Sequence, residues 1–309
     1  ISNTLMALAA QGKNIVTSKH LFGNTYALLV ATLRRFGVKV RLRDLTNIEA
    51  VREAIDDDTC CVFLEILTNP QLEVADLKAI SEVAHEKNVP LVVDSTVIPF
   101  TQFSAKSLGV DIEVVSSSKY VSGGATSLGG LVIDYGTPYN GDFAKRLYGE
   151  MLFNFGAYMT PQVAYMQTIG LETLDARYRV QSGNALELAK KLRSLPQIKY
   201  VNYVGLEDNP YHELAQRQFG KTAGAMICID LESKEACFSF LNNLKLIHRA
   251  TNLFDNRSLA IHPASTIFGA FSESMRKSMD VKDTTIRLSV GLEDVDDLFE
   301  DIKQAVNSL

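Results

Sequence analysis

The sequence predicts an α/β fold, with a mostly parallel sheet flanked by helices and a smaller C-terminal α+β domain. Through about the first 135 residues, short apolar runs alternate with longer stretches whose apolar residues recur at helical spacing. Two of the runs, residues 62–64 and 91–93, are wholly apolar, as in strands that are buried on both faces of a parallel sheet. The length of 309 residues is about twice that of a usual domain, which leaves room for both parts.

The first half contains six expected strands, at residues 14–18, 38–42, 60–66, 90–94, 112–116 and 130–133. Helical patterns lie between and before them, at residues 1–11, 26–36, 48–55, 75–87 and 104–108. This strand–helix–strand repetition predicts one large domain over residues 1–160. Because the first helical pattern starts with Ile1, we also expect a further segment in front of it.

Beyond residue 135 the pattern changes. Helical stretches follow at residues 161–170 and 171–195, and the second is long enough to bridge two domains. Expected strands at residues 225–231 and 285–290 precede a closing helix at residues 295–309. Residues 161–309 are therefore expected to hold bridging helices and a small α+β domain.

Composition excludes several classes of protein. With 46% hydrophobic and 22% charged residues, the chain is globular rather than disordered. Its net charge of −5 gives no electrostatic reason to bind nucleic acid or an anionic membrane. No apolar run approaches the ~20 residues of a membrane span and no signal peptide is recognisable, so we expect a cytoplasmic protein. The four cysteines have neither CxxC spacing nor a nearby His pair, which predicts free thiols and no metal site.

Three polar signals follow consecutive predicted strands: Asn69, Asp94, and the run SSSKY at residues 116–120. In an open parallel sheet the carboxyl ends of the strands converge on one ligand-binding edge. Asn69 and Asp94 are 25 residues apart, as are Asp94 and Lys119, which corresponds to one strand–helix step each. We therefore expect all three to face one crevice.

These residue types have a chemistry in common. A lysine desolvated at a sheet edge has a lowered pKa and becomes a usable amine nucleophile, although Lys119 alone could equally be a surface lysine. Ser116 and Ser118, on an extended strand, would project to the same side and, with the glycines at 123 and 124, could hold an anion. Asp94 taken alone could be a helix N-cap. An amine, an anion site and a carboxylate together describe a site for pyridoxal 5′-phosphate (PLP).

The chain resembles the fold-type I PLP-dependent enzymes of cysteine and methionine metabolism, the family of cystathionine γ-synthase, methionine γ-lyase and O-acetylhomoserine sulfhydrylase. The matching segments run through nearly all of it: HLFGNTY (20–26), FLEILTNP (63–70), VVDST (92–96), VVSSSKYVSGG (114–124), LGGLVID (128–134), GLETLDAR (170–177), SLAIHPAST (258–266) and IRLSVGLED (286–294). The resemblance implies a fold-type I PLP-transferase fold and PLP as the cofactor.

The resemblance also implies roles for the polar residues at the sheet edge. Lys119 would form the covalent link to the cofactor aldehyde, and Asp94 would pair with the pyridine nitrogen. Asn69 would donate a hydrogen bond to the 3′-oxygen of the cofactor. Ser116 and Ser118 would hold the phosphate.

Substrate contacts and two departures from the family pattern complete the implied site. Arg287 would bind the α-carboxylate of the amino acid and Asn252 would lie beside it, although Arg287 without the resemblance would be taken for a surface ion pair. Phe22 stands where most of the family has a tyrosine, so it would stack on the cofactor ring without offering a hydroxyl. Tyr26 could supply that hydroxyl or simply pack in a helix. Phe254 replaces the glycine of the family's NLGD run.

The function that the resemblance implies is γ-replacement: O-acetyl-L-homoserine and a sulfur donor give L-homocysteine and acetate, in methionine biosynthesis. The run ATNLFDNRSL (250–259) resembles the form found in O-acetylhomoserine sulfhydrylases. A leaving group such as acetate also suits a site in which Phe22 cannot donate a proton. The sulfur donor stays open between free sulfide, a thiol and a sulfur-carrier protein, and the family implies a homo-oligomer, at least a dimer and commonly a tetramer.

The sequence leaves other functions open. One is that of a cystathionine γ-synthase or of a methionine or cystathionine γ-lyase. Another is a non-catalytic binding subunit of the same fold, which would not need Lys119, Asp94 and Arg287 together. A Rossmann-type nucleotide binder is opposed by the lack of GxGxxG after the first strand.

Overall fold

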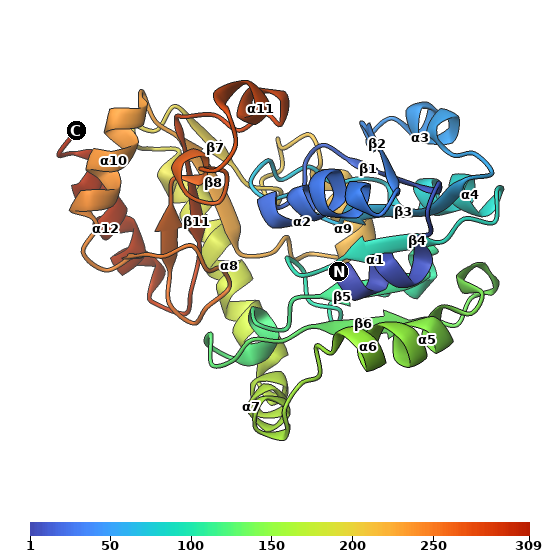
Figure 1. Cartoon of the computed structure of the whole chain (residues 1–309). Helices are drawn as coiled ribbons and strands as arrows, with labels where there is room; N and C mark the ends of the chain where they lie inside the picture. The colour runs from blue at the N-terminus through green and yellow to red at the C-terminus, as the bar shows by residue number, and fades with distance from the viewer.

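The computed structural model describes residues 1–309 and contains two separate sheets (Figure 1). The first is six-stranded, in the order β2-β1-β3-β4-β5-β6, and only β6 runs antiparallel to its neighbour. Its strands are β1 (Asn14–Ser18), β2 (Lys39–Arg43), β3 (Thr59–Glu65), β4 (Leu91–Asp94), β5 (Ile112–Val115) and β6 (Leu131–Asp134). This arrangement confirms the predicted α/β class and its mostly parallel sheet.

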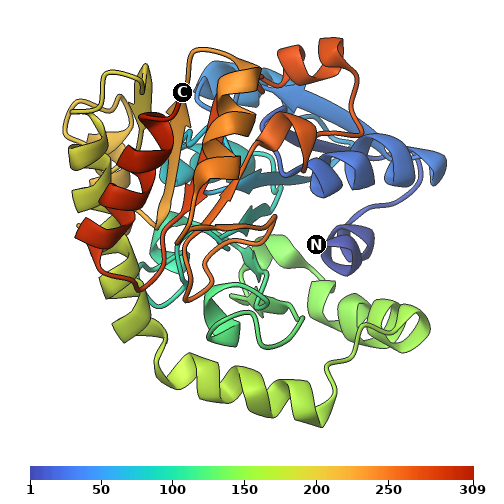
Figure 2. The same ribbon diagram turned by 90° about the vertical axis from the view of Figure 1, so that its left-hand side faces the viewer.

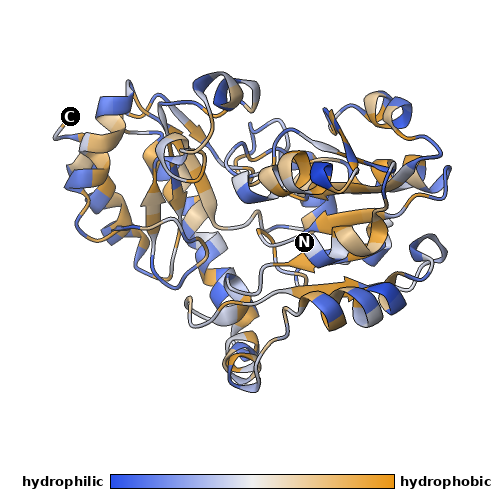
Figure 3. Ribbon diagram, in the orientation of Figure 1, coloured by the Kyte–Doolittle hydropathy of each residue, from blue (hydrophilic) through white to orange (hydrophobic).

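Helices cover both faces of the first sheet. Phe63 of β3 packs in one cluster of buried side chains with residues of α1 (Ser2–Leu8), α2 (Gly23–Ala27) and η1 (Leu28–Leu33). Val62 and Leu64 point the opposite way, into a cluster with α3 (Ile48–Ala54) and α4 (Leu77–His85). The central strands β3 and β4 are therefore mostly apolar on both faces, in agreement with the colour of the sheet in Figure 3.

The second sheet is five-stranded, in the order β7-β8-β11-β10-β9, and is mostly antiparallel. Its strands are β7 (Tyr200–Asn202), β8 (Met226–Asp230), β9 (His248–Arg249), β10 (Leu259–Ile261) and β11 (Thr285–Ser289). Around it lie α8 (Leu174–Leu192), α10 (Lys234–Asn243) and α12 (Val295–Val306), with α9 (His212–Phe219), η6 (Pro263–Ser265) and α11 (Glu273–Ser278) in the connections. Sequence patterning missed β7, β9 and β10, each of which has only two or three residues.

Short helices connect the two sheets. After β6 come η4 (Pro138–Asn140), α5 (Phe143–Arg146), η5 (Leu147–Leu152) and α6 (Phe153–Phe155). Then α7 (Pro161–Glu172) and α8 follow one another along the outside of the molecule (Figure 2). The proposed division at residue 160 falls between α6 and α7, and it stays a prediction.

The predicted elements agree with the structure to within a few residues at their ends, apart from one strand end. The strand expected over residues 112–116, with Ser118 extending it, stops at Val115, and a turn follows. The extended conformation expected for Ser116 to Ser118 was therefore wrong. All four cysteines are free thiols, as predicted. No helix is both long and apolar enough to cross a membrane.

Candidate active site

The polar segments that follow β3, β4 and β5 lie at one edge of the first sheet, as predicted. These strands are neighbours and run parallel, so their carboxyl ends point to the same side. Asn69 follows β3, Asp94 ends β4 and Lys119 follows β5. Arg287 of β11, in the second sheet, reaches the same edge, where its Nη1 donates a hydrogen bond to Asn69 Oδ1 over 3.3 Å. The site is thus built from both halves of the chain.

Lys119 is half-buried and forms no ion pair. Its backbone N–H donates to the Ser116 carbonyl over 3.1 Å, which closes the turn between β5 and η3 (Tyr120–Ser122). The Lys119 ammonium donates a hydrogen bond to Asn252 Oδ1. Burial and the nearby positive charge of Arg287 lower the pKa of Lys119. This amine therefore releases its proton more readily than a surface lysine, as a nucleophile or base requires.

Asp94 is a carboxylate without a cation. Its Oδ1 accepts hydrogen bonds from the Thr96 N–H over 2.9 Å and from the Thr96 hydroxyl over 2.5 Å. The Thr96 hydroxyl in turn accepts from the Ser116 N–H over 2.9 Å, which ties the ends of β4 and β5 together. Burial raises the pKa of Asp94, and the bonds from Thr96 oppose that rise. The local turn shows that Asp94 is not the cap of a regular helix.

Arg287 is a fully buried cation without an anion. The residue is 1% exposed, and its guanidinium donates to the carbonyls of Thr251 and Asn252 over 3.1 and 3.0 Å. It forms no ion pair, so the surface ion pair that its context alone indicates was wrong. Burial lowers the pKa of Arg287 to about 10, and the side chain stays charged at neutral pH. A buried positive charge of this kind is stabilised by an anionic ligand.

The two serines proposed for the phosphate lie in the turn after β5. The Ser118 hydroxyl accepts from the Gly129 N–H over 2.8 Å and donates to the Gly129 carbonyl over 3.2 Å. The Ser116 hydroxyl forms no hydrogen bond within the protein, so it is free to bind a ligand. Their role at a phosphate stays a prediction.

Phe22 is the N-cap residue of α2, and its backbone N–H donates to Glu65 Oε1 over 2.6 Å. Tyr26, one turn later, is buried and meets the Phe271 ring edge to face, with ring centroids 5.8 Å apart. Of the two readings of Tyr26, packing in a helix is the one that the structure shows. Pattern reasoning missed Glu65, because a single glutamate that closes an apolar strand looks like the start of a loop.

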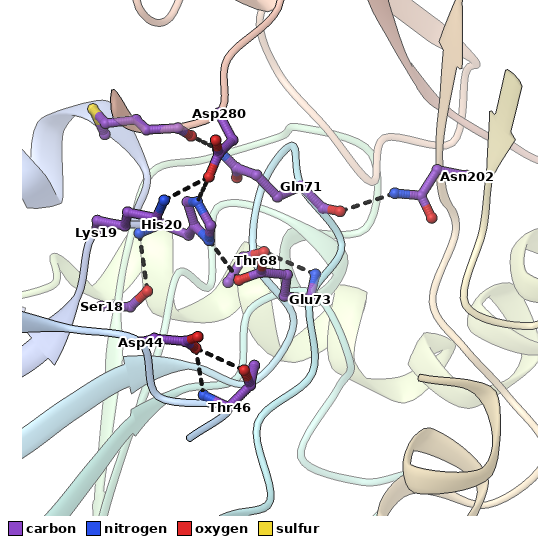
Figure 4. Close-up of polar contacts among 11 residues, drawn as sticks. Ser18, Lys19, His20, Asp44, Thr46, Thr68, Gln71, Glu73, Asn202 and Asp280 are labelled. Carbon is purple, nitrogen blue, oxygen red and sulfur yellow. Dashed lines mark hydrogen bonds and ion pairs between the residues drawn. The ribbon is translucent and has the colours of Figure 1, made fainter. Parts of the chain in front are cut away.

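A histidine holds the loop between β1 and α2 (Figure 4). The His20 ring lies 2.5 Å from Glu73 Oε2 through Nδ1 and 2.8 Å from Asp280 Oδ2 through Nε2. Lys19 adds an ion pair to Asp280, and the His20 N–H donates to the Ser18 hydroxyl. Burial lowers the pKa of His20, but the bonds to Glu73 and Asp280 outweigh it and the net pKa is raised.

Phe254 occupies the position where the family pattern has glycine. Its φ is +58°, a conformation in which a phenylalanine is rarely found. The ring is fully buried and stacks on Tyr120 with centroids 4.2 Å apart, and the Phe254 N–H donates to the Ser289 hydroxyl over 2.6 Å. Tyr120 follows Lys119 directly, so this stack joins the turn of Lys119 to the segment that carries Asn252.

Comparison with known proteins decides the family. The sequence model described as Cys/Met metabolism PLP-dependent enzyme matches residues 1–307. The chain belongs to this family. It is 37% identical to the L-methionine gamma-lyase of Fusobacterium nucleatum subsp. polymorphum over 313 residues, which cover 100% of this chain and 78% of that protein.

Solved structures agree with this assignment. A Campylobacter jejuni subsp. jejuni protein described as O-acetylhomoserine (thiol)-lyase superposes with a TM-score of 0.95 at 34% identity, over 99% of this chain and 79% of that one, and it carries N′-pyridoxyl-lysine-5′-monophosphate. The O-acetylhomoserine sulfhydrylase of Wolinella succinogenes, from its methionine biosynthetic pathway, superposes with a TM-score of 0.87 at 42% identity, over 99% of this chain and 88% of that one. The fold is fold-type I, and the cofactor of the family is PLP.

The residues at the sheet edge fit that cofactor. Lys119, Asp94 and Arg287 carry charges or a basic amine, yet none of them forms an ion pair with another residue. A protonated pyridine nitrogen would neutralise Asp94, an aldehyde would take up the Lys119 amine, and a substrate carboxylate would neutralise Arg287. When bound, PLP supplies the electron sink that a reaction at the α-carbon of an amino acid requires.

Proposed function

We propose that this chain catalyses γ-replacement, in which O-acetyl-L-homoserine and a sulfur donor give L-homocysteine and acetate. The bond from Cγ to the acetate oxygen breaks, a bond from Cγ to sulfur forms, and the proton of the thiol donor leaves with the acetate. The observation that carries the proposal is Phe22, which offers no hydroxyl to the leaving group. Acetate departs as a stable anion without such help, whereas a thiolate does so less readily.

Each polar residue of the site has a part in this proposal. Arg287 binds the substrate α-carboxylate with its planar guanidinium, next to Asn252. The Lys119 amine removes the proton from Cα and returns it at the end, because it is half-buried at this edge and its pKa is lowered. Asp94 holds a proton on the pyridine nitrogen. Asn69, which accepts a hydrogen bond from Arg287, orients the cofactor ring.

Two relatives support this function and one favours an alternative. The proteins from Campylobacter jejuni and Wolinella succinogenes bear names of O-acetylhomoserine enzymes at 34% and 42% identity. The protein from Fusobacterium nucleatum bears the name of a methionine γ-lyase at 37% identity. Methionine γ-elimination, which gives methanethiol, 2-oxobutanoate and ammonia, is therefore the second candidate.

A substrate panel tests the two candidates. Purified protein with PLP is given O-acetyl-L-homoserine with sulfide, with methanethiol or with a thiocarboxylated sulfur-carrier protein, and separately methionine or cystathionine. We expect γ-replacement on O-acetyl-L-homoserine with one of the sulfur donors at a higher kcat/KM than elimination from methionine or cystathionine. Lys119→Ala is the control and should form no product in any arm. A higher kcat/KM for 2-oxobutanoate release from methionine would overturn the proposal and establish the second candidate.

We propose further that the chain acts as a homo-oligomer. Five aromatic side chains between residues 148 and 165 are 61–79% exposed, namely Tyr148, Phe153, Phe155, Tyr158 and Tyr165. Monomeric proteins rarely expose so many large apolar side chains in one segment, and interfaces are enriched in them. A second copy of this chain is the partner that we propose for this segment.

A further inference from the structure

We propose that Glu65 is a positioning residue of this site, which holds the Phe22 loop as a neutral acid and leaves Asp94 as the single negative charge beside the pyridine nitrogen. The inference rests on the proposed function, because it assigns Phe22 and Asp94 to the cofactor. It goes beyond that function in naming a group that touches neither the substrate nor the cofactor.

The first observation is the register of two strands. Glu65 ends β3 and Asp94 ends β4, and the two residues are direct partners across the parallel pair. Neighbouring strands are about 4.8 Å apart and paired residues project to the same face, so the two carboxyl groups lie side by side. Glu65 is 6% exposed and forms no ion pair. Two carboxylates so close together, one buried and one half-buried, cannot both keep a negative charge at low cost.

The second observation is what each carboxyl group bonds to. Asp94 accepts two hydrogen bonds from Thr96, and these favour its anion. Glu65 Oε1 accepts a hydrogen bond of 2.6 Å from the backbone N–H of Phe22. A neutral acid can keep this bond through its carbonyl oxygen. Asp94 is therefore the better place for the charge and Glu65 for the proton.

The electrostatics agree with this division. Burial and the negative charge of Asp94 raise the pKa of Glu65 to about 8, although the backbone N–H groups of Phe22 and Asn69 oppose the rise. At neutral pH Glu65 thus keeps its proton. Glu65 thus contacts the backbone of Phe22, which is proposed to stack on the cofactor ring, and of Asn69, which is proposed to orient that ring.

Other titratable groups near Glu65 do not neutralise it. Glu73 lines the same small cavity as Glu65, but its carboxylate is bonded to His20. A second negative charge at Glu65 would compete with Asp94 for the ring proton, so the neutral form is the one that serves the site.

The experiment compares Glu65→Gln, Glu65→Ala and the exposed control Glu82→Gln. Glutamine is uncharged and can still accept from the Phe22 N–H, whereas alanine cannot. With PLP at pH 7, we expect Glu65→Gln to keep kcat/KM within about threefold of the wild type and PLP affinity likewise. Glu65→Ala should lose about tenfold or more in both. A Glu65→Gln variant as impaired as Glu65→Ala would show that the charge is needed and overturn the proposal.

A second measurement uses the protein without cofactor. The pKa of Glu65 is raised in the folded state, so folding is favoured at low pH and that contribution is lost as the pH rises toward 8. Denaturant unfolding at pH 5 to 9 gives the equilibrium constant for folding of the wild type and of Glu65→Gln. As the pH rises toward 8, the ratio of the wild-type constant to that of Glu65→Gln should fall by up to about tenfold per pH unit. Glu82→Gln should follow the wild type. A constant ratio between wild type and Glu65→Gln would overturn the proposal.

The two measurements separate this inference from the proposed function. If the panel shows no γ-replacement while the apo-protein shows the expected pH dependence, the proposed function fails and a neutral Glu65 stands. If γ-replacement is found but the pH dependence is missing, the function stands and the role of Glu65 fails. Should Glu65→Ala not fold, the comparison of Glu65→Gln with the wild type still decides.

Discussion

Three ionisable side chains of the site have no ion-pair partner within the protein. Asp94, Lys119 and Arg287 are each partly or wholly buried and none is paired with another residue of the chain. Leaving charges buried and unpaired destabilises the folded protein. Binding of a cofactor and an amino acid would relieve that cost, so we expect PLP to raise the unfolding temperature of the protein.

Arg287→Lys tests the carboxylate site. A lysine ammonium is a point charge and cannot reproduce the bidentate contact of a guanidinium. We expect the KM for the amino-acid substrate to rise about tenfold, which corresponds to about 1.4 kcal/mol, with a smaller change in kcat. Steady-state kinetics measure this, with the exposed Arg34→Lys as a control. An unchanged KM would place the carboxylate elsewhere.

Phe22→Tyr tests the leaving-group argument. The substitution keeps the aromatic ring and adds a hydroxyl, which can protonate a poor leaving group. We expect kcat/KM for elimination from methionine or cystathionine to rise relative to kcat/KM for O-acetyl-L-homoserine. Phe36→Tyr, at an exposed phenylalanine, should leave the ratio unchanged. If Phe22→Tyr also leaves it unchanged, Phe22 does not face the leaving group.

At the scale of elements, His20 ties the loop between β1 and α2 to two other segments. Glu73 belongs to the segment between β3 and α4, and Asp280 follows α11 in the second half of the chain. The bridge therefore joins segments from both halves of the chain (Figure 4). Because the charged form of His20 makes both contacts, the strength of the bridge depends on pH.

His20→Gln tests this bridge. The pKa of His20 is raised in the folded state, so its stabilising contribution is complete below the unfolded pKa and is lost as the pH rises through the folded one. Denaturant unfolding should show the wild type more stable than His20→Gln by about 1 kcal/mol at pH 5.5, with the difference vanishing at pH 9. His212→Gln, on α9, is the control. A difference that does not change with pH would contradict a charged His20.

At the scale of the whole molecule, the exposed aromatic segment between residues 148 and 165 predicts self-association. Phe153→Asp with Phe155→Asp places two charges in the proposed interface and should reduce the molecular mass measured by light scattering, because buried unpaired charges oppose association. Phe36→Asp, at a phenylalanine 61% exposed outside this segment, should leave the mass unchanged. A monomeric wild type at micromolar concentration would contradict the prediction.

The first sheet could be predicted from the sequence because its determinants are local. Strands such as β1 and β4 are short apolar runs next to amphipathic helices, and parallel strands bring their carboxyl ends to one edge. Asp94 and Lys119 were recognisable as site candidates for that reason. The turn after Val115 could not be predicted in this way, because serine side chains can form hydrogen bonds to the local backbone as readily as a run of serines can continue a strand.

The tertiary structure alone decided which distant residues join that edge. Arg287 lies in the middle of a strand and Glu65 closes an apolar one, so neither has a local context that marks it. Arg287 reaches Asn69 because the loop after β3 lies against the second sheet, and Glu65 reaches Asp94 because of the register of β3 and β4. Such contacts depend on the sum of many non-local packing interactions, whereas a strand end depends on a few neighbouring residues. The sequence by itself thus determined the fold class and the edge that holds the site, and the packing of the two halves determined which charges are left there for a ligand.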